Sequence, residues 1–244
     1  MIARIEAGTV NVSIDVAAGV CDALGVQLDL AFRTPFIVDR RPQRDAAHAR
    51  CSSYVQRRLE AAGWLVAREV EIVHGRSHGW IDLLAFDPRS RTLLIVEIKT
   101  ELDDLGRIER TVAWYEREAW SSGRRLGWRS IRAATWLLVL ATEVNDERLR
   151  ANRDLLGAAF PGRAAEAQEL LAGHTVAARR TLALIDPRSR RREWLIRSRV
   201  DGRRSLAPYR DYAGFMRRSS RRQTPRSEPA TRRRFAQVEP EAAI

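Results

Sequence analysis

The chain has 244 residues, a formal net charge of +12 and 45% hydrophobic residues, and this length suits one globular domain of about 150 residues with appendages. Its longest apolar runs are much shorter than a membrane span, and the first ten residues lack a signal-peptide core, so we expect a cytoplasmic protein with no membrane partner. Cys21 and Cys51 match no metal-binding spacing and are expected to be reduced.

A short amphipathic helix is predicted near the N-terminus. Ser13 is a suitable N-cap, because its side chain can accept a hydrogen bond from the first free amides of a helix. Gly25 is a suitable C-cap, since glycine adopts the left-handed backbone that often ends a helix. Between them, Val16, Val20 and Leu24 recur at helical spacing and predict a single apolar stripe.

The residues around this helix resemble the second half of an Xre/Cro-type helix-turn-helix domain. The matching features are the run Ile5-Glu6-Ala7-Gly8, the helix opening at Ser13 and the ending Ala23-Leu24-Gly25-Val26. The resemblance implies that residues 1–32 are a partial domain whose base-contacting helix would lie before Met1. We interpret this as a missing upstream segment; true loss of the DNA-reading helices and a generic amphipathic helix are the alternatives.

Residues 46–62 predict a longer helix, because apolar side chains recur at helical spacing and Gly63 follows where a glycine cap would stand. A strand is predicted over residues 65–73. Two further apolar runs, residues 79–87 and 93–100, are separated by Asp87-Pro88-Arg89-Ser90-Arg91, whose proline, aspartate and serine favour a tight turn. The two runs are therefore predicted to be neighbouring antiparallel strands.

The segment after these strands predicts a helix and a buried strand. Thr100 and Asp103 are candidate N-caps for a helix that continues to about Trp120. The apolar run at residues 134–141 is short and rich in β-formers, which is typical of a buried strand.

The C-terminal part of the domain is predicted to contain two helices and a second hairpin. Residues 146–172 predict two helices divided by Pro161-Gly162. A second hairpin is predicted from strands at residues 181–185 and 193–196. The turn between them, at residues 186–190, repeats the sequence of residues 87–91 letter for letter. The flanking runs do not align, so we interpret the repeat as convergent turn chemistry rather than a duplicated domain.

Lys99 is the only lysine in the chain, which otherwise uses arginine for positive charge. Glu97 precedes it by two residues, so on a strand the two side chains share one face while Val96 and Ile98 point the other way. Asp82 lies on the neighbouring predicted strand. Two nearby carboxylates need a cation to offset their repulsion, and Mg²⁺ prefers hard oxygen ligands. A surface ion pair between these groups is the alternative.

This arrangement resembles the catalytic core of the PD-(D/E)XK nuclease superfamily, which includes many restriction endonucleases and Holliday-junction resolvases. The resemblance implies that Asp82 and Glu97, with the backbone carbonyl of Ile98, bind Mg²⁺ or Mn²⁺ and that Lys99 positions the attacking water. It also implies an α/β restriction endonuclease-like fold, a mixed sheet flanked by helices, which we place at residues 44–200. Many members carry an acidic residue on the first helix, where residues 47–56 have none; Glu71 is a possible auxiliary ligand.

Charge is concentrated near the C-terminus. Residues 188–234 contain seventeen arginines and only four acidic residues, a balance of +13, so a polyanion would be attracted mainly there. We expect residues 215–244 to form a disordered arginine-rich tail, either as a DNA-holding arm or as a solvated segment. The candidate nucleic-acid-binding residues are Arg107, Arg110, Arg217, Arg218, Arg221 and Arg222.

These patterns favour a Mg²⁺-dependent DNA endonuclease that hydrolyses phosphodiester bonds. One alternative is a non-catalytic DNA-binding transcriptional regulator of the Xre type that uses the nuclease-like fold for binding or sensing. Another is a toxin or defence component whose cleavage is switched on by a partner. Cutting both DNA strands usually takes two catalytic centres, so a homodimer is expected, although no residue pattern identifies its interface.

Overall fold

The computed structural model describes residues 13–26, 40–74, 77–174, 176 and 180–220. The chain divides into two compact units, residues 1–40 and 41–244. None of the described helices combines the length and apolar character needed to cross a membrane.

The described part of the first unit contains helix α2, Ile14–Ala23. The side chain of Ser13 accepts a hydrogen bond from the amide of Val16 at 3.4 Å, so the predicted helix and its N-cap are confirmed. The C-cap is Leu24 rather than Gly25, which follows it with a φ of 66°. No residue of α2 is buried, and Val16 and Leu24 of the predicted stripe are 38% and 71% exposed. The other residues of the helix-turn-helix resemblance lie mostly outside the described residues.

The second unit is built on a six-stranded mixed sheet with the strand order β1-β2-β3-β4-β5-β6. The strands are β1 (Leu65–His74), β2 (Ser77–Asp87), β3 (Thr92–Lys99), β4 (Arg132–Leu140), β5 (Arg180–Ile185) and β6 (Leu195–Ile196). β1, β2 and β3 pair antiparallel, β3, β4 and β5 pair parallel, and β6 returns antiparallel to β5. The predicted α/β class with a mixed sheet is confirmed, as are both predicted hairpins.

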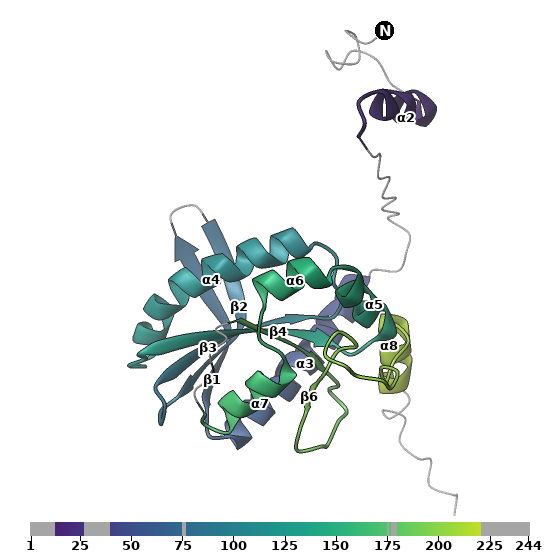
Figure 1. The fold of residues 1–244 in the computed structure, drawn as a ribbon. Helices are drawn as coiled ribbons and strands as arrows, with labels where there is room; N and C mark the ends of the chain where they lie inside the picture. The colour runs from purple at the N-terminus through teal and green to yellow at the C-terminus, as the bar shows by residue number, and fades with distance from the viewer. Residues whose placement is uncertain (1–12, 27–39, 75–76, 175, 177–179, 221–244) are drawn as a thin grey trace, which may run out of the picture. The chain divides into compact units, whose positions relative to one another are not determined.

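Helices cover both faces of this sheet (Figure 1). They are α3 (Arg40–Ala61), α4 (Leu105–Arg125), α5 (Glu143–Ala151), α6 (Arg153–Ala159), α7 (Ala164–Leu171) and α8 (Tyr212–Ser220). Along β3, Leu94, Val96 and Ile98 belong to a core cluster with α3, α7 and α8, whereas Leu93 and Ile95 belong to a cluster with α4. The alternation of side chains along β3 therefore separates an α3 side of the sheet from an α4 side.

Two predicted helical segments differ from the structure. The N-cap of α4 is Asp104, whose Oδ1 accepts from the amide of Arg107 at 2.8 Å, rather than Thr100 or Asp103. The region predicted as two helices contains three. The helical structure is interrupted at Asn152, between α5 and α6, and again near Pro161, between α6 and α7.

The predicted domain end at residue 200 and the predicted start of a disordered tail at residue 215 are both wrong. Residues 212–220 form α8, and Phe215 is 1% exposed and Tyr209 3% exposed in the same core cluster as α3. Burial of these aromatic rings is favourable enough to order a segment whose many arginines suggested a solvated tail. Residues 221–244 lie outside the described residues.

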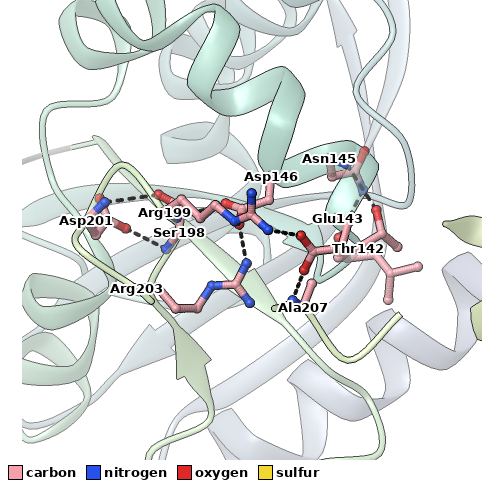
Figure 2. A network of polar contacts seen from close by, with 10 residues as sticks. Thr142, Glu143, Asn145, Asp146, Ser198, Arg199, Asp201, Arg203 and Ala207 are labelled. Atoms are coloured by element: carbon pink, nitrogen blue, oxygen red, sulfur yellow. Dashed lines mark hydrogen bonds and ion pairs between the residues drawn. The ribbon is translucent and has the colours of Figure 1, made fainter. Parts of the chain in front are cut away.

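A network of polar contacts fastens the chain before α8 to the first turn of α5 (Figure 2). Asp146 has no exposed surface and pairs with Arg199 and Arg203. Glu143 pairs with Arg199 and accepts a hydrogen bond from the backbone amide of Ala207. The two carboxylates also lie at the N-terminal end of a helix, where its dipole favours negative charge. The network thus holds the segment that leads to α8.

Candidate active site

The candidate site lies where strands β2 and β3 separate. Their pairing runs from the turn to Leu83 and Val96, and the next pair in register, Asp82 and Glu97, is no longer part of the ladder. The register of β1 with β2 also skips Asp82 together with Glu69, which has a φ of 47°. The loss of regular pairing on both sides lets the Asp82 carboxylate turn away from the regular strand geometry.

The side chains of β2 confirm that its alternation is broken at this point. Ile81 and Leu84 are three residues apart, yet both face the core cluster beneath α4. Leu83 faces the cluster beneath α3. Asp82 therefore occupies an irregular position between the two sides of the sheet, from which it reaches residues on both.

Two groups hold the Asp82 carboxylate. Its Oδ2 accepts a hydrogen bond from the backbone amide of Ile98 at 2.6 Å. Its Oδ1 lies 3.1 Å from Nε2 of His48, on α3. The hydrogen bond to Asp82 raises the pKa of His48, although burial opposes the shift. Protonation of His48 is therefore favoured while the carboxylate stays charged, and the two groups form a charge-assisted pair.

Glu97 and Lys99 share the α4 side of β3, as predicted. Lys99 Nζ donates to Glu97 Oε1 at 2.5 Å, and Glu97 is only 3% exposed. Among the described residues, Glu97 Oε2 has no hydrogen-bond partner although it is buried. Burial, with a smaller contribution from the charge of Asp82, raises the pKa of Glu97 to about 7. A buried carboxylate with one unsatisfied oxygen is poorly stabilised by the protein alone.

The three side chains open into a cleft of about 690 Å³ between β2, β3 and α4. Tyr115 on α4 donates to the backbone carbonyl of Trp80 at 2.7 Å and ties this helix to β2. Gly79 is required for close packing here, because a Cβ at this position would come within 2.6 Å of the Trp114 ring. The remaining cleft residues are mostly polar: His78, Glu101, Asp103, Asp104, Arg107 and Thr111.

The structure brings together four of the residues predicted as catalytic or metal-binding: Asp82, Glu97, Ile98 and Lys99. Glu71 is not among the cleft residues; its exposed carboxylate lies 2.5 Å from Nε2 of His78. The proposed role of Glu71 as an auxiliary ligand therefore loses its geometric basis.

The predicted nucleic-acid-binding arginines are dispersed. Arg107 lines the cleft, whereas Arg110 is exposed on α4 outside it. Arg217 lies 4.0 Å from Asp211, and Arg218 lines a different cavity. Arg221 and Arg222 lie outside the described residues.

His48 is the site residue that sequence reasoning missed. His48 lies within residues 47–56, the stretch of the first helix that lacks the acidic residue expected from the resemblance. Its contact with Asp82 links positions 34 residues apart, so only the packing of α3 on the sheet reveals it.

The donor set fits a hard divalent cation with an incomplete protein shell. Within the described part of the chain, no group of three or more His, Cys, Asp or Glu side chains is arranged to hold a metal ion. Mg²⁺ commonly needs only one or two carboxylates, with water and other oxygens completing its octahedron. The unsatisfied Oε2 of Glu97, beside Asp82, meets that smaller requirement.

Comparison with known proteins gives no family assignment. No protein-family model matches this chain, and no curated protein matches it significantly. The resemblances carried by short motifs in the sequence therefore stay predictions, and the functional argument depends on the geometry of the cleft.

Proposed function

We propose that the cleft binds Mg²⁺ or Mn²⁺ and hydrolyses phosphodiester bonds in DNA, as an endonuclease of the PD-(D/E)XK type. The observation that carries the proposal is the buried Glu97 carboxylate, whose free oxygen faces no donor of the described chain while its charge is opposed by Asp82. A divalent cation would stabilise both carboxylates in their charged forms.

The residues have distinct roles in this proposal. Asp82 and Glu97, with the carbonyl oxygen of Ile98, would hold the metal, and His48 and the amide of Ile98 orient Asp82. The bound ion would polarise a phosphoryl oxygen and lower the pKa of water. Lys99 is 33% exposed at its side chain and already pairs with Glu97, so its ammonium can reach both a water and a phosphate oxygen in the cleft.

The mouth of the cleft offers surfaces that suit a nucleic acid. Trp80 is 51% exposed, and its ring lies 4.4 Å from the ring of His78. An exposed aromatic ring can stack on an unpaired base, which would be needed where a duplex is opened or branched. Arg107 adds a guanidinium that can contact a backbone phosphate.

Plasmid nicking tests the proposal. Purified protein would be incubated with supercoiled plasmid and Mg²⁺, beside Asp82→Asn and Lys99→Ala variants and the control Asp154→Asn, which removes a carboxylate that is 95% exposed on α6. We expect nicking by the parent and the control, and its loss in both site variants and in EDTA. Equal, metal-independent DNA binding by all four proteins without nicking would instead favour the non-catalytic regulator.

A further inference from the structure

A second cavity, which we call the arginine cavity, lies on the α3 side of the sheet. Its volume is about 960 Å³, it is open to solvent, and it is bordered by the second half of α3, the turn at residues 186–190, the segment before α8 and α8 itself. Five arginines line it, from α3, the turn and α8: Arg57, Arg58, Arg188, Arg190 and Arg218.

The positive charge of this cavity has little compensation. Among the residues that the structure describes, none of these five arginines forms an ion pair, whereas Arg163, Arg180 and Arg199 elsewhere in the same domain do. Asp186 also lines the cavity and supplies one negative charge against the five positive ones. Positive charges gathered around a hollow attract an anion into it, most strongly at low ionic strength.

Two of the guanidinium groups are held in place by neutral contacts. Arg58 donates to the backbone carbonyl of Ser189 at 2.9 Å and lies 5.2 Å above the ring of Tyr54. Arg218 donates to the carbonyl of Pro208 at 3.2 Å and lies over the ring of Tyr209. These contacts leave other N–H donors of each guanidinium available, because the group carries five. The cavity is thus partly organised before any ligand binds.

The aromatic residues of the cavity limit what it can recognise. Tyr54 and Tyr209 are 4% and 3% exposed, so neither presents a ring face on which a base could stack. Arginine, in contrast, matches the geometry of phosphate oxygens with paired N–H donors. A ligand would therefore be recognised through its phosphates and not through a base.

We propose that the arginine cavity binds an oligophosphate anion, either a run of phosphates in a nucleic-acid backbone or the polyphosphate chain of a free nucleotide. The cavity lies on the α3 side of the sheet, whereas the Asp82 cleft is lined by α4. The proposal therefore does not rest on the proposed nuclease activity.

Calorimetric titration of the full chain with inorganic tripolyphosphate tests this site, in EDTA and at fixed ionic strength. The test variant is Arg57→Ala with Arg190→Ala, two exposed arginines of the cavity. The matched control is Arg124→Ala with Arg150→Ala, two exposed helix arginines that do not line it. We expect the test variant to lose about tenfold or more in affinity and the control to keep the parent value.

Equal affinity in the parent and the test variant would overturn the proposal, as would an equal loss in the control, since binding would then follow net charge alone. If the test variant fails to fold, Arg57→Lys with Arg190→Lys replaces it and should retain part of the affinity. Asp82→Asn should leave tripolyphosphate binding unchanged, which separates this site from the cleft.

Competition identifies the source of the phosphates. ATP and tripolyphosphate should bind with similar affinity, because the base adds no contact. Displacement of tripolyphosphate by a short DNA duplex would assign the cavity to a nucleic-acid backbone, and displacement by ATP without displacement by DNA would assign it to a free nucleotide. A strong preference for ATP over tripolyphosphate would contradict recognition through phosphates.

Discussion

The Asp82 cleft and the arginine cavity lie on different sides of the same sheet and carry opposite charges. In the cleft, Glu97 is almost completely buried and has an unsatisfied oxygen. In the cavity, most of the guanidinium groups reach solvent and lack carboxylate partners within the described chain. One hollow therefore suits a cation and the other an anion.

The difference between the two sites is also one of chemistry. A buried carboxylate can avoid the free-energy cost of burying its charge by taking up a proton, so its charge depends on pH and on a metal. An arginine stays protonated throughout the physiological range and can be neutralised only by an anion. The network around Asp146 differs from both sites, because its carboxylates and guanidinium groups already neutralise each other.

The largest effect is expected at Lys99. If the cleft is the proposed nuclease centre, Lys99→Ala should reduce Mg²⁺-dependent plasmid nicking on the order of 10²–10³-fold, because the proposed reaction would lose a positive charge beside the phosphate. Lys99→Arg keeps the charge but replaces a compact ammonium with a planar fork, so it should restore only a small part of the rate. Rates of nicking measure both, and full activity of Lys99→Ala would show that the cleft is not catalytic.

Breaking the ion-pair network around Asp146 should mainly lower the stability of the fold. Asp146→Ala should lower the free energy of unfolding by about 3 kcal/mol, because it leaves Arg199 and Arg203 without their shared buried partner. Urea denaturation monitored by circular dichroism measures the change. Arg124→Ala, on the exposed surface of α4, serves as the control and should change stability little.

The raised pKa of Glu97 in the cleft should make the stability of the protein depend on pH. The pKa of Glu97 is raised from 4.5 to about 7 in the folded protein, so its favourable contribution is complete below about pH 4.5 and is lost as pH rises through 7. Glu97→Gln removes this loss and should be about 1–2 kcal/mol more stable than the parent at pH 8 without metal. Denaturation at a series of pH values measures the difference.

Added Mg²⁺ sharpens the same experiment. It should stabilise the parent at pH 8 but not Glu97→Gln, because only the parent retains both carboxylates. A parent whose stability relative to Glu97→Gln does not change between pH 5 and 8 would show that Glu97 is not held at a raised pKa.

The smallest effect is expected at Tyr209, whose hydroxyl donates to one oxygen of Asp186 in the arginine cavity. Tyr209→Phe removes the hydroxyl that donates to Asp186 Oδ1 at 2.6 Å, so this oxygen can accept from a neighbouring guanidinium group instead. Affinity for tripolyphosphate should fall a few-fold, and the free energy of unfolding should fall by about 1 kcal/mol. An increase in affinity would mean that Asp186 does not compete with the anion.

Local sequence patterns predicted much of the framework. The glycine after α3, the two hairpins and the shared face of Glu97 and Lys99 all follow from residues that are close together in the chain. The sequence also identified Asp82 as the neighbouring carboxylate. The irregular pairing that frees its side chain was not predictable, because it depends on how β1 and β3 pair with β2.

The repeated pentapeptide shows the limit of local prediction most clearly. In the turn at residues 87–91, Asp87 is fully buried and pairs with Arg89 at 3.1 Å. In the identical turn at residues 186–190, Asp186 bonds to the hydroxyl of Tyr209, and Arg188 faces the arginine cavity. Both sequences form a turn after a strand, but their surroundings give the same side chains different partners.

The sequence by itself determined the strands, the turns and the shared face of Glu97 and Lys99 on β3, because period-2 alternation and turn chemistry act over a few residues. Only the tertiary structure decided that His48 would meet Asp82, that Phe215 would order α8, and that arginines from three separate segments would surround one cavity. These contacts join residues far apart in the chain, and they form because burial of the apolar faces of the helices fixes where the polar side chains lie.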